Sequence, residues 1–166
     1  MKKTIILMTK SFKRKNYCFA GIDCKTGDWI RLVSDDKDSE GAVLCEDVKY
    51  NDGTEANVLD IVEVDLIRPN PTAAQSENWL YNRNITWKKC GVATLQQVIN
   101  FRGLDNCGDN IFGNTDKSIS PQNVNGKSLA LIKADFPYIV VKTVVVSLTG
   151  AYKNDSLHYK MLAQLF

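Results

Sequence analysis

The chain has 166 residues, of which 44% are hydrophobic and 24% are charged, a balance typical of a folded protein with a core of its own. Its apolar stretches fall far short of the roughly 20 residues that a membrane span requires, and its five cysteines are scattered without a close pair, which disfavours a disulfide framework or a zinc site. The N-terminal apolar run is short and does not resemble a signal peptide, so we expect a soluble, cytoplasmic protein.

The start of the chain has the pattern of three antiparallel strands. Residues 4–9 are apolar and β-branched, and the polar run 10–15 that follows them is expected to be a loop. A second strand is expected over residues 16–23, and a turn containing Gly27 connects it to a third strand over residues 29–33. The pattern therefore predicts a β-meander.

The chain continues mainly as strands. Residues 35–57 are expected to form an acidic loop with one short strand near 42–45, and residues 59–67 alternate apolar and acidic side chains as a half-buried strand does. Apolar residues recur at helical spacing over 93–101, which predicts one short helix. The other expectations are a packed connector over 72–89, an irregular loop over 102–127, strands over 128–133 and 138–148, and a helix or, alternatively, a strand over 156–166.

Charge is unevenly distributed along the chain. Residues 1–34 hold eight Lys or Arg and two acidic residues, whereas residues 35–66 hold two Lys and eleven acidic residues. One interpretation is a bipolar surface that orients an anionic partner. The alternative is that the two segments lie side by side and neutralise each other.

The sequence nominates no catalytic or metal-binding residue. His158 is the only histidine, and a lone histidine is more often a surface or packing residue than a base. The four carboxylates between Asp35 and Glu40 do not have the spacing of an EF-hand loop, and an acidic surface loop explains them better. Glycine patterns that bind phosphate are absent. We therefore expect no enzymatic activity, no metal and no cofactor.

The remaining candidate is a combination of basic and aromatic residues in the first hairpin. On a small barrel, exposed rings stack on bases while Lys and Arg follow the phosphate backbone. The alternative is that Trp29 anchors the core, Tyr17 covers an edge and the basic run is merely solvated. The candidate nucleic-acid-binding residues are Lys10, Lys13, Arg14, Lys15, Tyr17, Trp29, Arg31 and Arg68.

Several of these residues belong to a longer pattern. It consists of Cys18-x-Ala20-Gly21-Ile22-Asp23, then Thr26-Gly27-x-Trp29-Ile30-Arg31-Leu32-Val33-Ser34, then Leu59-Asp60-Ile61-Val62-Glu63-Val64 and Glu77-Asn78-Trp79. The pattern resembles the dual OB-containing domain family of uncharacterised, mainly bacterial proteins, with Leu32 where a proline is expected. The resemblance implies two OB-like barrels in tandem and a role in nucleic-acid binding, and it brings no catalytic residues.

We therefore expect a mainly β protein with minor helical content, in which an OB-like small β-barrel is followed by a second, smaller or incomplete OB-like β unit. The expected parts are the barrel over 1–75, a connector with a short helix and an irregular loop over 76–127, and a C-terminal β unit over 128–166. After Leu148 the chain lacks the further strands of a complete second barrel. That barrel is then incomplete, replaced in part by a helix, or closed by another subunit of a homo-oligomer.

The function favoured by these features is non-catalytic binding of nucleic acid, either single-stranded or structured RNA or DNA, through the basic loop and the neighbouring aromatic face. Two alternatives stay open. One is a module that binds a protein partner, which the acidic segment 35–66 motivates. The other is a sensor that binds a small nucleotide in the mouth of the barrel. No membrane partner is expected.

Overall fold

The computed structural model describes residues 1–13, 15–107, 110–113, 115, 119–120, 123 and 126–133. Residues Met1–Ile132 form one compact unit. The strand expected over 138–148 and the helix or strand expected over 156–166 lie outside the described residues.

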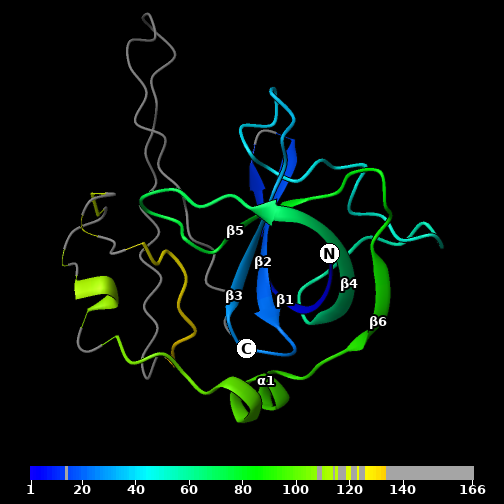
Figure 1. Ribbon diagram of the computed structural model, residues 1–166. Helices are drawn as coiled ribbons and strands as arrows, with labels where there is room; N and C mark the ends of the chain where they lie inside the picture. The colour runs from blue at the N-terminus through cyan, green and yellow to red at the C-terminus, as the bar shows by residue number, and fades with distance from the viewer. Residues whose placement is uncertain are drawn as a thin grey trace, which may run out of the picture. The chain divides into compact units, whose positions relative to one another are not determined.

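Strands of the described residues form one sheet that closes on itself. The sheet order is β1-β2-β3-β5-β4-β6, and β1 also pairs with β4, so the first five strands make a ring. All neighbours in this ring are antiparallel except β3 and β5, which are parallel (Figure 1). This is the expected OB-like barrel in a mainly β protein. The strands are β1 (Lys2–Lys13), β2 (Asn16–Asp23), β3 (Trp29–Val33), β4 (Asp60–Pro69), β5 (Asn78–Tyr81) and β6 (Lys88–Val92).

Strand β1 closes the ring because it is long enough to pair on both edges. Its start, from Lys2 to Ile6, pairs with β4, and the part from Ile5 to Lys13 pairs with β2, with a bulge between Leu7 and Thr9. The strands approach closely beside this bulge: a Cβ placed on Gly21 would lie 2.3 Å from the carbonyl oxygen of Ile6. Only glycine fits such an approach, so Gly21 is required for the bend of β1.

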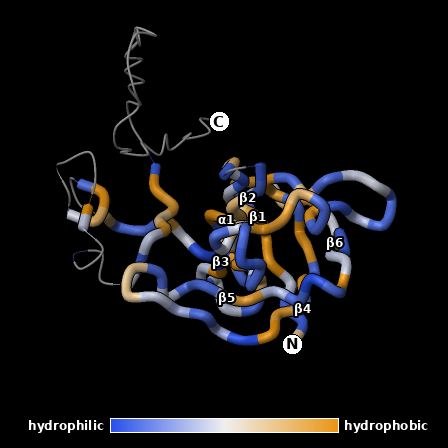
Figure 2. Tube along the Cα trace, turned by 90° about the horizontal axis from the view of Figure 1, so that it is seen from above, coloured by the Kyte–Doolittle hydropathy of each residue, from blue (hydrophilic) through white to orange (hydrophobic). Residues whose placement is uncertain are grey.

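Two apolar clusters lie on opposite faces of the barrel wall, as the period of two in a strand requires. Ile5 and Leu7 of β1 belong to the cluster inside the ring, whereas Ile6 and Met8 belong to a second cluster outside it. Helix α1 (Leu95–Arg102) covers the outer cluster with Val98. In Figure 2 the strands change between hydrophobic and hydrophilic colours along their length, which reflects this alternation.

Helix α1 confirms the expectation of one short helix over 93–101. It begins after Thr94, whose side chain accepts a hydrogen bond from the Gln97 N–H while the Gln97 side chain accepts one from the Thr94 N–H. This capping box fixes the start of the helix beside the barrel. The described helices are too short to cross a membrane.

Three local expectations are wrong. The basic run 10–15 is not a loop, because β1 continues through Lys13. The connector expected over 72–89 contains β5, which closes the ring beyond residue 75, and the start of β6. Residues 128–133 contain no strand. A fourth expectation, the short strand near 42–45, is met only in part, because the segment forms a single bridge between Val43 and Tyr17. The division at residues 75 and 127 stays a prediction.

Candidate nucleic-acid interface

The end of the β1–β2 hairpin, residues 12–17, carries an exposed aromatic ring between basic residues; we call it the hairpin tip. The side chain of Phe12 is 69% exposed, and Lys13 and Lys15 flank the turn. Lys15 takes a left-handed backbone conformation, with φ of 69°, that makes the turn tight. Arg14 lies outside the described residues. In Figure 1 the hairpin tip lies at the top and α1 at the bottom of the view.

A series of aromatic rings leads from the hairpin tip into the barrel core. The ring centroids of Phe12 and Tyr17 are 5.6 Å apart, those of Tyr17 and Phe19 are 5.8 Å apart, and those of Phe19 and Trp87 are 5.6 Å apart. Trp87 in turn meets Tyr81 at 5.9 Å. The last three rings are at most 1% exposed. The exposed ring of Phe12 therefore rests on a series of packed aromatic rings that leads to the barrel core.

Acidic residues accompany the basic residues of the hairpin. The Lys10 ammonium lies 3.2 Å from the carboxylate of Glu55 and 4.8 Å from the ring centroid of Tyr17. The Lys13 ammonium donates a hydrogen bond to the Glu40 carbonyl and lies 3.7 Å from the Glu40 carboxylate. Desolvation and the Glu55 carboxylate raise the pKa of Tyr17, so its ring stays neutral at physiological pH.

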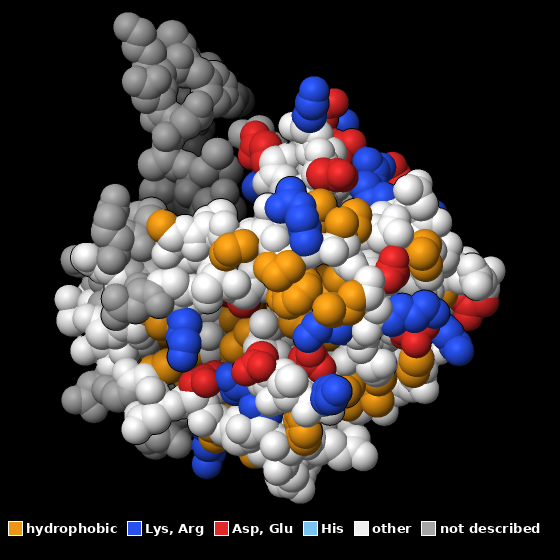
Figure 3. Space-filling view, viewed as in Figure 1, with side chains coloured by type: hydrophobic (Ala, Val, Ile, Leu, Met, Phe, Trp, Pro, Cys, Tyr) orange, Lys and Arg blue, Asp and Glu red, His pale blue; other side chains and the backbone are white. Residues whose placement is uncertain are grey.

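These contacts answer the question raised by the uneven charge distribution. Glu40 and Glu55 belong to the acidic segment 35–66, as does Glu63, whose carboxylate lies 2.8 Å from the Lys2 ammonium. The basic and acidic segments thus lie side by side and neutralise each other. Figure 3 shows the same arrangement on the visible face, where Lys and Arg side chains lie among Asp and Glu side chains.

Trp29 and Arg31 do not share a face with Tyr17, so the expected single basic and aromatic face is wrong. Trp29 packs in the cluster outside the ring, whereas Tyr17 packs against the cluster inside it. The Arg102 guanidinium lies 5.2 Å from the Trp29 ring centroid and covers it. Arg31 lies 3.6 Å from the Glu77 carboxylate. The physical reason is that the period of two places Trp29 and Arg31 on the outer face of β3.

Arg68 lies apart from the hairpin tip in the topology. It is near the end of β4, opposite Leu80 of β5, and its side chain is exposed. Its guanidinium donates a hydrogen bond of 3.5 Å to the Asn70 side chain, within the β4–β5 connection. Of the predicted site residues, the structure therefore brings together Lys10, Lys13, Lys15 and Tyr17 but places Trp29, Arg31 and Arg68 elsewhere.

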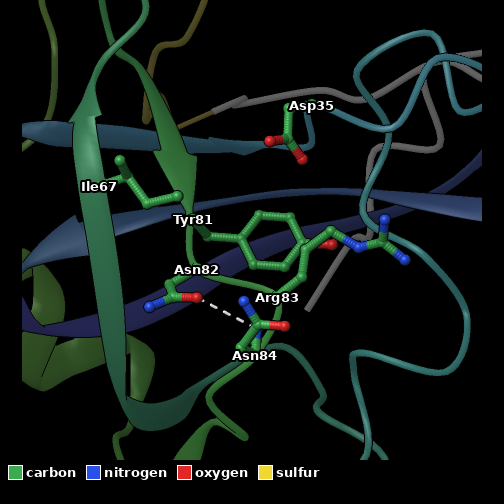
Figure 4. Close-up of a pocket in the computed structure, with 6 residues that line it drawn as sticks. All are labelled: Asp35, Ile67, Tyr81, Asn82, Arg83 and Asn84. Atoms are coloured by element: carbon green, nitrogen blue, oxygen red, sulfur yellow. Dashed lines mark hydrogen bonds between the residues drawn. The ribbon is translucent and has the colours of Figure 1, made fainter.

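A polar cavity of about 360 Å³ lies at the end of β5, beside Ile67 of β4 (Figure 4). The backbone N–H of Asn84 donates to the Asn82 side chain at 3.1 Å, and the Arg83 guanidinium is bound by Asp36 and Asp47. Among the described residues, no three His, Cys, Asp or Glu side chains converge as metal ligands do. The lining residues are Asp35, Ile67, Tyr81, Asn82, Arg83 and Asn84.

Comparison with known families agrees with the closed barrel. The family model of the dual OB-containing domain matches residues 3–144. The chain belongs to that family. No match was found among curated proteins or among solved structures. Membership of the dual OB-containing domain family gives the chain a fold of the type that binds oligonucleotides and oligosaccharides, and it assigns no ligand.

Phe12 is the residue of this dual OB-containing domain that sequence reasoning missed. The signal was present, because Phe12 lies within the run Lys10-Ser11-Phe12-Lys13, in which its ring is the only apolar side chain among polar ones. A large apolar residue in such a run is either exposed or covered by a segment that is distant in the sequence, and the run itself does not show which. The structure shows that it is exposed.

Proposed function

We propose that the protein binds single-stranded nucleic acid through the hairpin tip, without catalysing a reaction. The observation that carries this proposal is the exposed ring of Phe12, held on packed rings between basic residues. OB barrels bind oligonucleotides with the loop between their first two strands among other elements. An exposed ring stacks on any base, because every base has a π-face, so the proposed binding tolerates different sequences.

In the proposed complex the ring of Phe12 stacks on one base. Lys15 and Lys13 contact the phosphates on either side, and Arg14 adds a third cation by its position in the sequence. Lys13 has to exchange its contact with Glu40 for a phosphate, which costs part of the gain. The proposed binding is therefore moderate in strength and strongly dependent on salt.

Fluorescence anisotropy of a labelled oligothymidylate tests this proposal. We expect the single strand to bind more tightly than the corresponding duplex, because a base inside a duplex has no free face for Phe12. We also expect the affinity to fall by at least tenfold when the salt concentration rises from about 50 mM to about 200 mM. Undetectable or salt-independent binding would reject the proposal.

A second candidate function rests on the cavity at the end of β5. Its volume of about 360 Å³ is at the lower end of the range of small-ligand sites, and the Tyr81 ring lies in its wall. A small nucleotide is the ligand that we propose for it. Thermal unfolding in the presence of a nucleotide panel tests this alternative, and a panel that leaves the melting temperature unchanged rejects it.

For either function we propose the cytoplasm as the location, since all five cysteines are free.

A further inference from the structure

A segment of the chain covers the outer face of β3 and the start of β5; we call residues 126–132 the covering segment. The carbonyl of Gly126 accepts a hydrogen bond of 2.8 Å from the Ser76 N–H. Near its other end, Leu131 and Asp105 exchange two hydrogen bonds of 2.7 Å, and Leu131 packs against the cluster outside the ring. The covering segment is thus attached at both ends.

Between these attachments, the hydroxyl of Ser128 lies between two charged side chains. It accepts a hydrogen bond of 2.7 Å from the Arg31 Nη2 and donates a short one to the Glu77 carboxylate. The side chains of Arg31 and Glu77 are 20% and 7% exposed. The covering segment therefore lies on a partly buried ion pair, and such a pair is weak evidence of a stabilising role because desolvation offsets the attraction of the charges.

The guanidinium of Arg31 is incompletely bonded in this arrangement. Its Nε atom is buried, and among the described residues no hydrogen-bond acceptor is within reach of it. The nearest carboxylate oxygen, from Glu77, is 3.6 Å away, which is too long for a hydrogen bond. A buried donor without an acceptor is costly, and the Nε and Nη2 atoms of arginine together match the two oxygens of a phosphate.

We propose that Arg31 is a latent phosphate-binding site and that the covering segment keeps it closed. When Ser128 leaves, one phosphate oxygen takes its place at Nη2 and a second reaches Nε, so that the unbonded donor gains an acceptor. The phosphate belongs either to a nucleic-acid backbone or to a free phosphate or nucleotide, and the two sources require different probes.

This site is separate from the hairpin tip, so it is tested in a Phe12→Ala background with the full chain. Ser128→Ala removes the hydroxyl that closes the site, and Glu77→Gln removes the competing negative charge. Each substitution is expected to raise the affinity for phosphate groups by about fivefold, the factor that corresponds to one hydrogen bond of ordinary strength. Arg31→Lys keeps the charge but loses the forked geometry, and it is expected to abolish the gain.

The measurement is isothermal titration of these variants with two probes, inorganic phosphate and a short oligothymidylate. A gain with the oligonucleotide alone assigns the site to a nucleic-acid backbone, and a gain with both probes assigns it to any phosphate. A gain that Arg31→Lys leaves intact, or the absence of a gain in both Ser128→Ala and Glu77→Gln, overturns the proposal. Because Phe12 is absent from all these variants, failure of binding at the hairpin tip does not affect the result.

Discussion

The ring of Phe12 meets the ring of Tyr17 edge to face, with centroids 5.6 Å apart and planes inclined by 72°. One partner in this contact is exposed to solvent, and the other is packed on the barrel core. The contact therefore presents an apolar ring to solvent in a fixed position, which spares a ligand the cost of ordering it. This relationship is the basis of the proposed interface.

Lys15 is expected to contribute to binding mainly through charge. Replacing it with Ala removes about one phosphate contact, so the slope of log affinity against log salt should become shallower by about 0.7 for a single strand. Lys37→Ala is the matched control, because Lys37 is also exposed but lies in the acidic segment 35–66. Equal slopes for the two variants and the wild type would contradict a phosphate contact at Lys15.

Glu55 is expected to weaken binding, because its carboxylate occupies Lys10. Glu55→Gln leaves a side chain of the same size and frees the ammonium for a phosphate. We predict an affinity increase of about twofold to threefold at low salt, which disappears as the salt concentration rises. The same titration in anisotropy measures this effect. An affinity that falls would show that Glu55 supports the site instead of competing with it.

Acid is expected to destabilise the barrel through Asp60. Burial alone would raise the pKa of Asp60, but bonds from Lys89, the Asn57 N–H and the Tyr50 hydroxyl more than offset it and lower this pKa. A group whose pKa is lower in the folded state stabilises the fold above its unfolded pKa, near 4, and this contribution is lost as the pH falls through the folded value.

Asp60→Asn should therefore cost about 2 kcal/mol at pH 7 and flatten the loss of stability below about pH 4. Urea unfolding at a series of pH values measures both effects. If the variant and the wild type lose stability in parallel between about pH 4 and pH 2, Asp60 does not carry the acid sensitivity.

Gly21→Ala is expected to destabilise the barrel strongly, because the added Cβ would lie 2.3 Å from a backbone oxygen of β1. We predict a loss of ~3 kcal/mol or more in the free energy of unfolding. Gly53→Ala is the control: its φ is 82°, but nothing lies within 4 Å of the added atom, so only backbone strain of ~1 kcal/mol is expected. Similar losses for both variants would contradict the close approach of β1 and β2.

The strands with clear alternation could be predicted from the sequence, and β2, β3 and β4 lie close to where they were expected. The end of β1 could not, because charge in a run such as 10–15 usually indicates a loop. In the structure Lys10 faces the rings of Tyr17 and Phe19, which lets a charged residue occupy a strand. Strand β5 was missed because its four residues are too few to show a period.

The composition of the candidate site was only partly predictable for a different reason. The sequence identifies Trp29 and Arg31 as neighbours of the basic run, but their environment depends on Arg102 and Ser128, which are distant in the chain. Alternation along β3 separates the two faces of the strand, yet it does not say which face a later segment covers. The neutralisation of the hairpin cations likewise depends on where the acidic segment folds back.

The most direct test of the central claim compares two exposed phenylalanines. Phe12 is 69% exposed at the hairpin tip, and Phe101 is 50% exposed on α1. Stacking on one base predicts that Phe12→Ala weakens binding of an oligothymidylate by about tenfold, while Phe101→Ala leaves it unchanged and both variants keep the wild-type fold. Equal affinities for Phe12→Ala and the wild type would contradict the account.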